Sequence, residues 1–104
     1  MKMGRVNFSR DQIVDFCKRN HIRKLALFGS VLRDDFRPDS DIDILIDIEQ
    51  EAVVTFLDIA RMEIELSEML NGRKVDLRTP SEFGKYLNKV ITEAEVQYER
   101  AFHS

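Results

Sequence analysis

Two aspartates separated by one residue open a run of alternating isoleucines, and this pattern most strongly limits how the chain can fold. Residues 41–48 read DIDILIDI. Successive side chains of a strand point to opposite faces. The isoleucines therefore share one face, and the other carries Asp41, Asp43, Leu45 and Asp47. We expect the isoleucine face to be buried and the opposite face to hold two neighbouring carboxylates at the start of the strand.

These two carboxylates repel each other unless a cation lies nearby. Alternate residues of a strand are about 6–7 Å apart, where two unit charges repel by about 2.5 kcal/mol at an effective dielectric constant of about 20. Edge strands also carry charges simply to stay soluble, which is the simpler interpretation. The functional interpretation is a divalent cation held by oxygen ligands. Mg²⁺ is favoured because it binds through a few carboxylates together with substrate phosphates.

An apolar run over residues 25–28, LALF, precedes this strand and ends at Gly29-Ser30. The run is typical of a buried strand. Glycine permits close backbone approach, N–H groups at the start of a helix bind phosphate, and the serine hydroxyl adds a donor. Alone, Gly29-Ser30 would indicate an ordinary turn. With a strand on each side and Asp41-x-Asp43 ten residues later, it predicts a phosphate-binding turn beside the carboxylates.

The acidic triplet Asp39-x-Asp41-x-Asp43 also resembles the opening of a calcium-binding EF-hand loop. That loop requires a glycine where this chain has Ile44 and a closing glutamate where it has Gln50. The sequence therefore excludes a calcium loop.

The remaining elements follow from apolar periodicity. A first helix is predicted after Ser9, its N-cap, and a long helix over residues 53–70, ending at Asn71-Gly72. A short strand is predicted over residues 74–78, in which Asp76 points away from its apolar neighbours. A last helix is predicted from a seam with 3–4 spacing, formed by Leu87, Val90, Ile91, Ala94, Tyr98, Ala101 and Phe102. Cys17 is interpreted as a small buried hydrophobe and His21 as a surface residue.

Gly29-Ser30, ten residues and then Asp41-x-Asp43 resemble the signature of the DNA polymerase beta-like nucleotidyltransferase superfamily. The flanking LFGS and RPDSDIDILI resemble its small prokaryotic members, the minimal nucleotidyltransferases (MNT proteins), which include the antitoxins of HEPN/MNT toxin–antitoxin systems. Small members often read GSRARG. This chain reads GSVLRD, without the first arginine and the last glycine, and retains Arg33.

The resemblance implies an α/β fold with a small mixed sheet of three to four strands flanked by helices, like the palm of polymerase beta. It also implies nucleotidyl transfer, in which a hydroxyl attacks the α-phosphate of ATP and pyrophosphate leaves. The implied catalytic residues, which would also bind two Mg²⁺ ions, are Asp41, Asp43 and Asp76. The implied nucleotide-binding residues are Gly29, Ser30 and Arg33.

Composition limits the partners. At 104 residues we expect one domain, residues 1–104, and a net charge of −3 argues against a dedicated nucleic-acid binder. No apolar stretch has the length of a membrane span or signal peptide, so we expect a cytoplasmic protein.

The chain has no room for a second domain that would hold the acceptor, so we expect a partner to supply it. The resemblance implies that this partner is a HEPN-family ribonuclease toxin, neutralised by adenylylation in a hetero-oligomer. The alternatives are an antitoxin that neutralises the toxin by binding alone and a small-molecule transferase. The latter is disfavoured because it needs additional structure for its acceptor.

Overall fold

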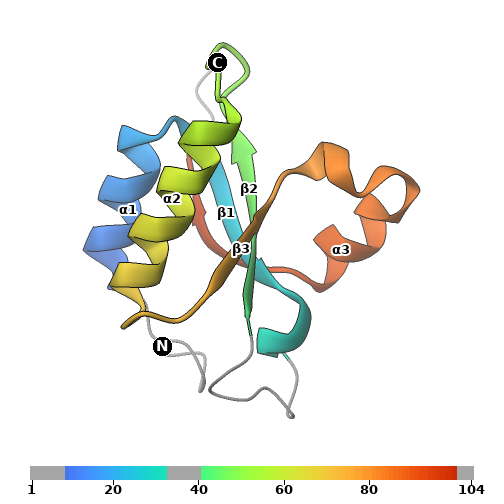
Figure 1. Cartoon of the computed structure of the whole chain (residues 1–104). Helices are drawn as coiled ribbons and strands as arrows, with labels where there is room; N and C mark the ends of the chain where they lie inside the picture. Colours follow the sequence, from blue (N-terminus) through green and yellow to red (C-terminus); the bar gives the residue numbers. More distant parts are fainter. Residues whose placement is uncertain (1–8, 33–40, 101–104) are drawn as a thin grey trace.

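The computed structural model describes residues 9–32 and 41–100, and shows helices packed on a small sheet (Figure 1). Along the chain the elements are α1 (Arg10–Arg19), β1 (Ile22–Phe28), the 3-10 turn η1 (Gly29–Leu32), β2 (Ile42–Ile48), α2 (Phe56–Met69), β3 (Val75–Arg78), the 3-10 turns η2 (Pro80–Glu82) and η3 (Gly84–Tyr86), α3 (Leu87–Glu93) and β4 (Glu95–Glu99). Within the described ranges, no helix has the length and apolar character needed to span a bilayer.

The sheet is mixed and its strand order is β3-β2-β1-β4. β1 pairs antiparallel with both β2 and β4, whereas β3 pairs parallel with β2. A parallel pair needs a long crossover connection, which α2 supplies. The predicted class, an α/β fold with a three- to four-stranded mixed sheet, is confirmed.

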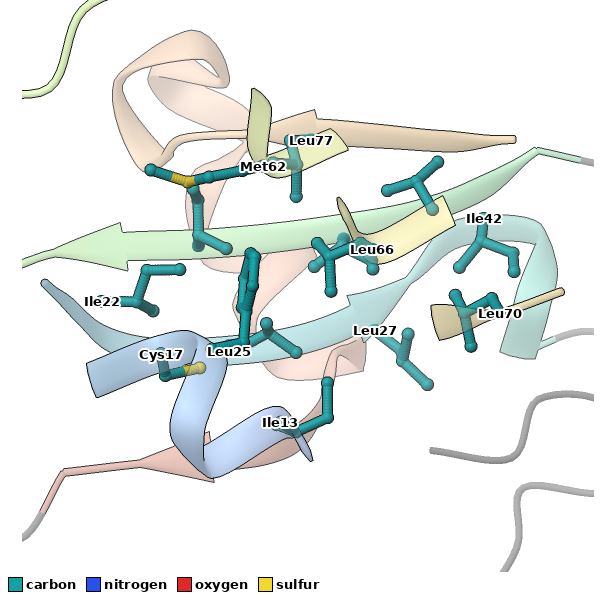
Figure 2. Close-up of a cluster of buried hydrophobic side chains, with 14 residues drawn as sticks. Ile13, Cys17, Ile22, Leu25, Leu27, Ile42, Met62, Leu66, Leu70 and Leu77 are labelled. Atoms are coloured by element: carbon teal, nitrogen blue, oxygen red, sulfur yellow. The ribbon is translucent and has the colours of Figure 1, made fainter. Parts of the chain in front are cut away.

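The core lies between one face of this sheet and helices α1 and α2, which run side by side (Figure 1). Ile42, Ile44 and Ile46 of β2 are fully buried on that face. Figure 2 shows the cluster they join, in which Leu25 and Leu27 of β1 lie near side chains of both helices. The predicted division of the second strand into a buried isoleucine face and a carboxylate face is confirmed.

Side-chain caps set where the two long helices begin. The Ser9 hydroxyl accepts a hydrogen bond from the Gln12 N–H (3.4 Å), as expected of an N-cap. Thr55 and Asp58 form a reciprocal capping box, with the Thr55 N–H donating to Asp58 Oδ2 (2.9 Å). This cap starts α2 at Phe56, three residues later than predicted.

The predicted last helix is wrong beyond residue 93. α3 ends at Glu93, and Glu95–Glu99 forms β4, with Val96 opposite Ala26 of β1. The residues at 94, 96 and 98 are Ala, Val and Tyr, so the segment also fits the two-residue period of a strand. Pairing satisfies the backbone groups along the edge of β1, which decides between the two periods. Ala101 and Phe102 lie outside the described residues.

The interpretations of Cys17 and His21 are confirmed. Cys17 is fully buried in the core, and burial raises the pKa of its thiol to about 12. The thiol therefore stays protonated near neutral pH, as expected of a structural cysteine. His21 is exposed in the turn between α1 and β1.

Candidate functional site

Three predicted site residues lie in a row across neighbouring strands. Gly29 directly follows β1, whose last residue, Phe28, is opposite Asp43 of β2. Across the parallel pair, Asp43 is opposite Asp76 of β3. Residues opposite each other in neighbouring strands point to the same face, so Asp43 and Asp76 share the face that α1 and α2 leave uncovered.

The backbone at Gly29 lies against the carboxylate of Asp43. A Cβ atom added at Gly29 would overlap Asp43 Oδ2 and would lie 3.2 Å from Asp43 Cγ. Gly29 also has φ +76°, a conformation that side chains other than glycine rarely adopt. Both the conformation and the close approach therefore require glycine here.

Asp41 lies just before β2, at the same end as Asp43. The backbone beside it is fixed by the Ile42 N–H, which donates to the carbonyl oxygen of Lys74 (2.9 Å). The Lys74 ammonium is 3.9 Å from Asp41 Oδ2, and both side chains are largely exposed. Lys74 thus places a positive charge close to the carboxylate pair.

Asp76 is held by an arginine on its own strand. Arg78 Nη2 and Nε donate to Asp76 Oδ2 at 2.8 and 3.3 Å, and Nη1 donates to Glu82 Oε1 at 3.2 Å. The pKa of Arg78 is raised, mainly by its hydrogen bonds to Asp76 and secondly by the hydrogen bond to Glu82. The pKa of Glu82 is lowered, mainly because its carboxylate accepts a hydrogen bond from the Thr79 backbone N–H.

The donor chemistry of this face fits Mg²⁺. Asp41, Asp43 and Asp76 offer carboxylate oxygens, the ligand type that Mg²⁺ prefers, and the backbone of Gly29 lies directly against the carboxylate of Asp43. Among the described residues, no group of three or more Asp, Glu, His or Cys side chains is gathered around one point. The carboxylate of Asp76 instead contacts Arg78.

Of the two remaining predicted nucleotide-binding residues, the structure describes the position of one. Ser30 lies in η1, directly after Gly29. Arg33 and Asp39 lie outside the described residues.

Sequence reasoning missed the cations Lys74 and Arg78. The available signal was their spacing around Asp76, because residues 74, 76 and 78 lie on the same face of a strand.

Comparison with known proteins identifies the family. Residues 10–98 match the family described as "Nucleotidyltransferase domain". The protein adenylyltransferase MntA of Thermococcus cleftensis is 35% identical over 74 residues, which are 71% of this chain and 72% of that protein. A solved structure assigned as a minimal nucleotidyltransferase is 32% identical, has a TM-score of 0.67, and is matched over 82% of this chain and 85% of its own.

A more distant structural relative shares the fold. It is a chain of the complex of a tri-AMPylated Shewanella oneidensis HEPN toxin with an MNT antitoxin. It is 19% identical, with a TM-score of 0.61, over 86% of this chain and 69% of that one. The matched residues cover every described helix and strand apart from Glu99, the last residue of β4. They include the glycine turn and all three carboxylates. The chain belongs to the nucleotidyltransferase-domain family.

Proposed function

We propose that this chain is a Mg²⁺-dependent protein adenylyltransferase that uses ATP and acts as the antitoxin of a HEPN-family toxin. The observation that carries the reaction is the row formed by Gly29, Asp43 and Asp76, in which a glycine turn lies against one carboxylate and a second carboxylate is its neighbour in register. The relatives support the protein substrate, since one is named a protein adenylyltransferase and another forms a complex with an AMPylated HEPN toxin.

The three carboxylates would share the binding of Mg²⁺ in this reaction. Asp41 and Asp43 would hold both ions, and Asp76 would complete the site of the catalytic ion. Asp76 also helps to remove the proton from the attacking hydroxyl. Bound Mg²⁺ supplies neutralisation of phosphate charge and a lower pKa for the hydroxyl. The oxygen of the acceptor hydroxyl forms a bond with the α-phosphorus of ATP as the bond to pyrophosphate breaks.

The phosphate side of the site comes from the turn after β1. Gly29 and Ser30 contact the β- and γ-phosphates, and Arg33 adds a positive charge to them. Residues 1–104 act as one domain and, because ATP is the donor, we place the reaction in the cytoplasm.

Nucleotide binding should depend on divalent cation, because without the cation the negatively charged triphosphate faces carboxylates of like charge. Calorimetric titration of the protein with ATP should show binding that weakens at least about 10-fold when excess chelator replaces Mg²⁺. Equal affinity under the two conditions would contradict a shared metal–triphosphate site.

The segment 53–64, which begins just before α2 and includes its first half, is the proposed docking surface for the toxin. Phe56 is 95% exposed, Val53 is 89% exposed, and Leu57 and Ile64 are also exposed. Large apolar side chains gathered on one surface are typical of protein interfaces. A groove of about 460 Å³ lies between α2 and the end of β3, and its lining includes Phe56 and Arg78. The groove therefore extends from the apolar surface to Arg78, the arginine that contacts Asp76.

Replacing Phe56 with serine should weaken toxin binding about 10-fold or more, because an exposed aromatic anchor is lost. The unfolding free energy should change by no more than about 0.5 kcal/mol, since the side chain is exposed in the free protein. The matched control is Ile91→Ser, on α3 across the sheet, which should bind like the wild type. Unchanged binding by Phe56→Ser, or a loss confined to Ile91→Ser, would exclude this surface.

A further inference from the structure

Arg78 lies at the end of β3 and bridges two carboxylates. Asp76 precedes it by two residues on the same face, and Glu82 lies in η2. The guanidinium donates twice to Asp76 Oδ2 and once to Glu82 Oε1. The three side chains are between 32% and 46% exposed, so this is a solvent-accessible contact on the carboxylate face.

The two partners of Arg78 differ in how firmly they are held. Glu82 Oε2 accepts from the Thr79 N–H (2.8 Å) and the Thr79 hydroxyl (3.2 Å), which fixes this carboxylate and leaves Oε1 for Arg78. For Asp76, the hydrogen bonds described all come from Arg78. If the Asp76 carboxylate turns away, Arg78 therefore keeps a fixed anionic partner at Glu82.

We propose that Arg78 is a positioning residue that competes with the divalent cation for Asp76. This inference rests on the proposed function, because it takes Asp76 to be a metal ligand. In the metal-free protein Arg78 neutralises Asp76 and engages one of its carboxylate oxygens, and no metal-ligand group is gathered in the described part of the chain. When the cation binds, Asp76 leaves Arg78, and Arg78 remains on Glu82. Arg78 thus limits how tightly the cation binds before the nucleotide arrives.

The test measures Mn²⁺ binding in the absence of nucleotide, with electron paramagnetic resonance reporting the concentration of the free ion. Arg78→Gln should bind Mn²⁺ about 3- to 5-fold more tightly than the wild type, the gain expected from removing one partly exposed ion pair. The matched control is Arg23→Gln. Arg23 also pairs with an aspartate of β2, Asp47, at the far end of the carboxylate face from Gly29, and its loss should leave Mn²⁺ affinity unchanged.

A double-mutant cycle separates the contact from a general effect of charge. If Arg78 acts through Asp76, the gain from Arg78→Gln disappears in an Asp76→Asn background. A gain that persists there, or unchanged or weaker Mn²⁺ binding by Arg78→Gln, would overturn the proposal. The single variant Asp76→Asn tests the underlying function separately. If it binds Mn²⁺ as tightly as the wild type, Asp76 is not a ligand and the proposed function loses that assignment, whereas weaker binding retains it whatever Arg78 does.

Discussion

Replacing Gly29 with alanine should lower nucleotidyl transfer by at least about 100-fold while leaving the protein folded. The added Cβ would overlap Asp43 Oδ2, so the carboxylate or the turn must move. A displacement of about 1 Å at a reacting centre can cost about 100-fold in rate. The positive φ of Gly29 adds a strain of about 1–2 kcal/mol, which should appear as a lower unfolding free energy. Transfer of label from α-labelled ATP and urea unfolding measure the two effects.

Gly72 provides a matched control for the backbone strain. Its φ is +85°, close to that of Gly29, but a Cβ added there would meet nothing within 4 Å. Gly72→Ala should therefore lose a similar unfolding free energy and keep its transfer rate. If both glycine variants lose activity equally, the effect of Gly29→Ala comes from stability, and the contact with Asp43 has no special role.

The double substitution Asp41→Asn with Asp43→Asn should lower label transfer by at least about 1000-fold, because metal binding contributes several kcal/mol to lowering the barrier. The fold should be retained, since the change removes two mutually repelling carboxylates and both lie outside the buried core. The unfolding free energy of the metal-free protein should stay the same or rise slightly.

Asp47→Asn is the control for this pair. Asp47 lies on the same strand and the same face as Asp43 but pairs with Arg23, away from the glycine turn. It should transfer label at close to the wild-type rate. A double variant that keeps wild-type transfer would remove Asp41 and Asp43 from the mechanism, and one that unfolds would indicate a structural role for them.

The central part of the fold could be predicted because two short-range signals agreed there. The alternation of isoleucine and aspartate defined β2 and its buried face, and the apolar run before Gly29 defined the end of β1. The strand β1 begins at Ile22, earlier than the run at 25–28, because Ile22 and Lys24 also pair with β2, with an irregularity in the register between them. Pairing depends on the neighbouring strand, which local composition does not reveal.

Two further features that escaped prediction also depend on tertiary contacts. Ala94 and Tyr98 fit the helical seam, and together with Val96 they also fit the two-residue period of a strand, so the presence of β1 beside them selects the strand. In the sequence, Arg78 is only the last residue of a predicted short strand. Its contact with Asp76 depends on both side chains lying on the face of that strand that is turned to solvent. The carboxylate positions were predicted from the sequence, whereas the cations beside them were not, although their spacing was visible there.

The most direct test is the mass of a HEPN-family toxin that is coexpressed with this chain. With the wild-type chain, the toxin should gain the mass of one or more AMP groups and should stay inactive after this protein is stripped away. With the Asp41→Asn, Asp43→Asn variant, the toxin should keep its unmodified mass. A toxin that is unmodified by the wild-type chain and regains full ribonuclease activity on separation would contradict catalysis, and would show that this protein neutralises its partner by binding alone.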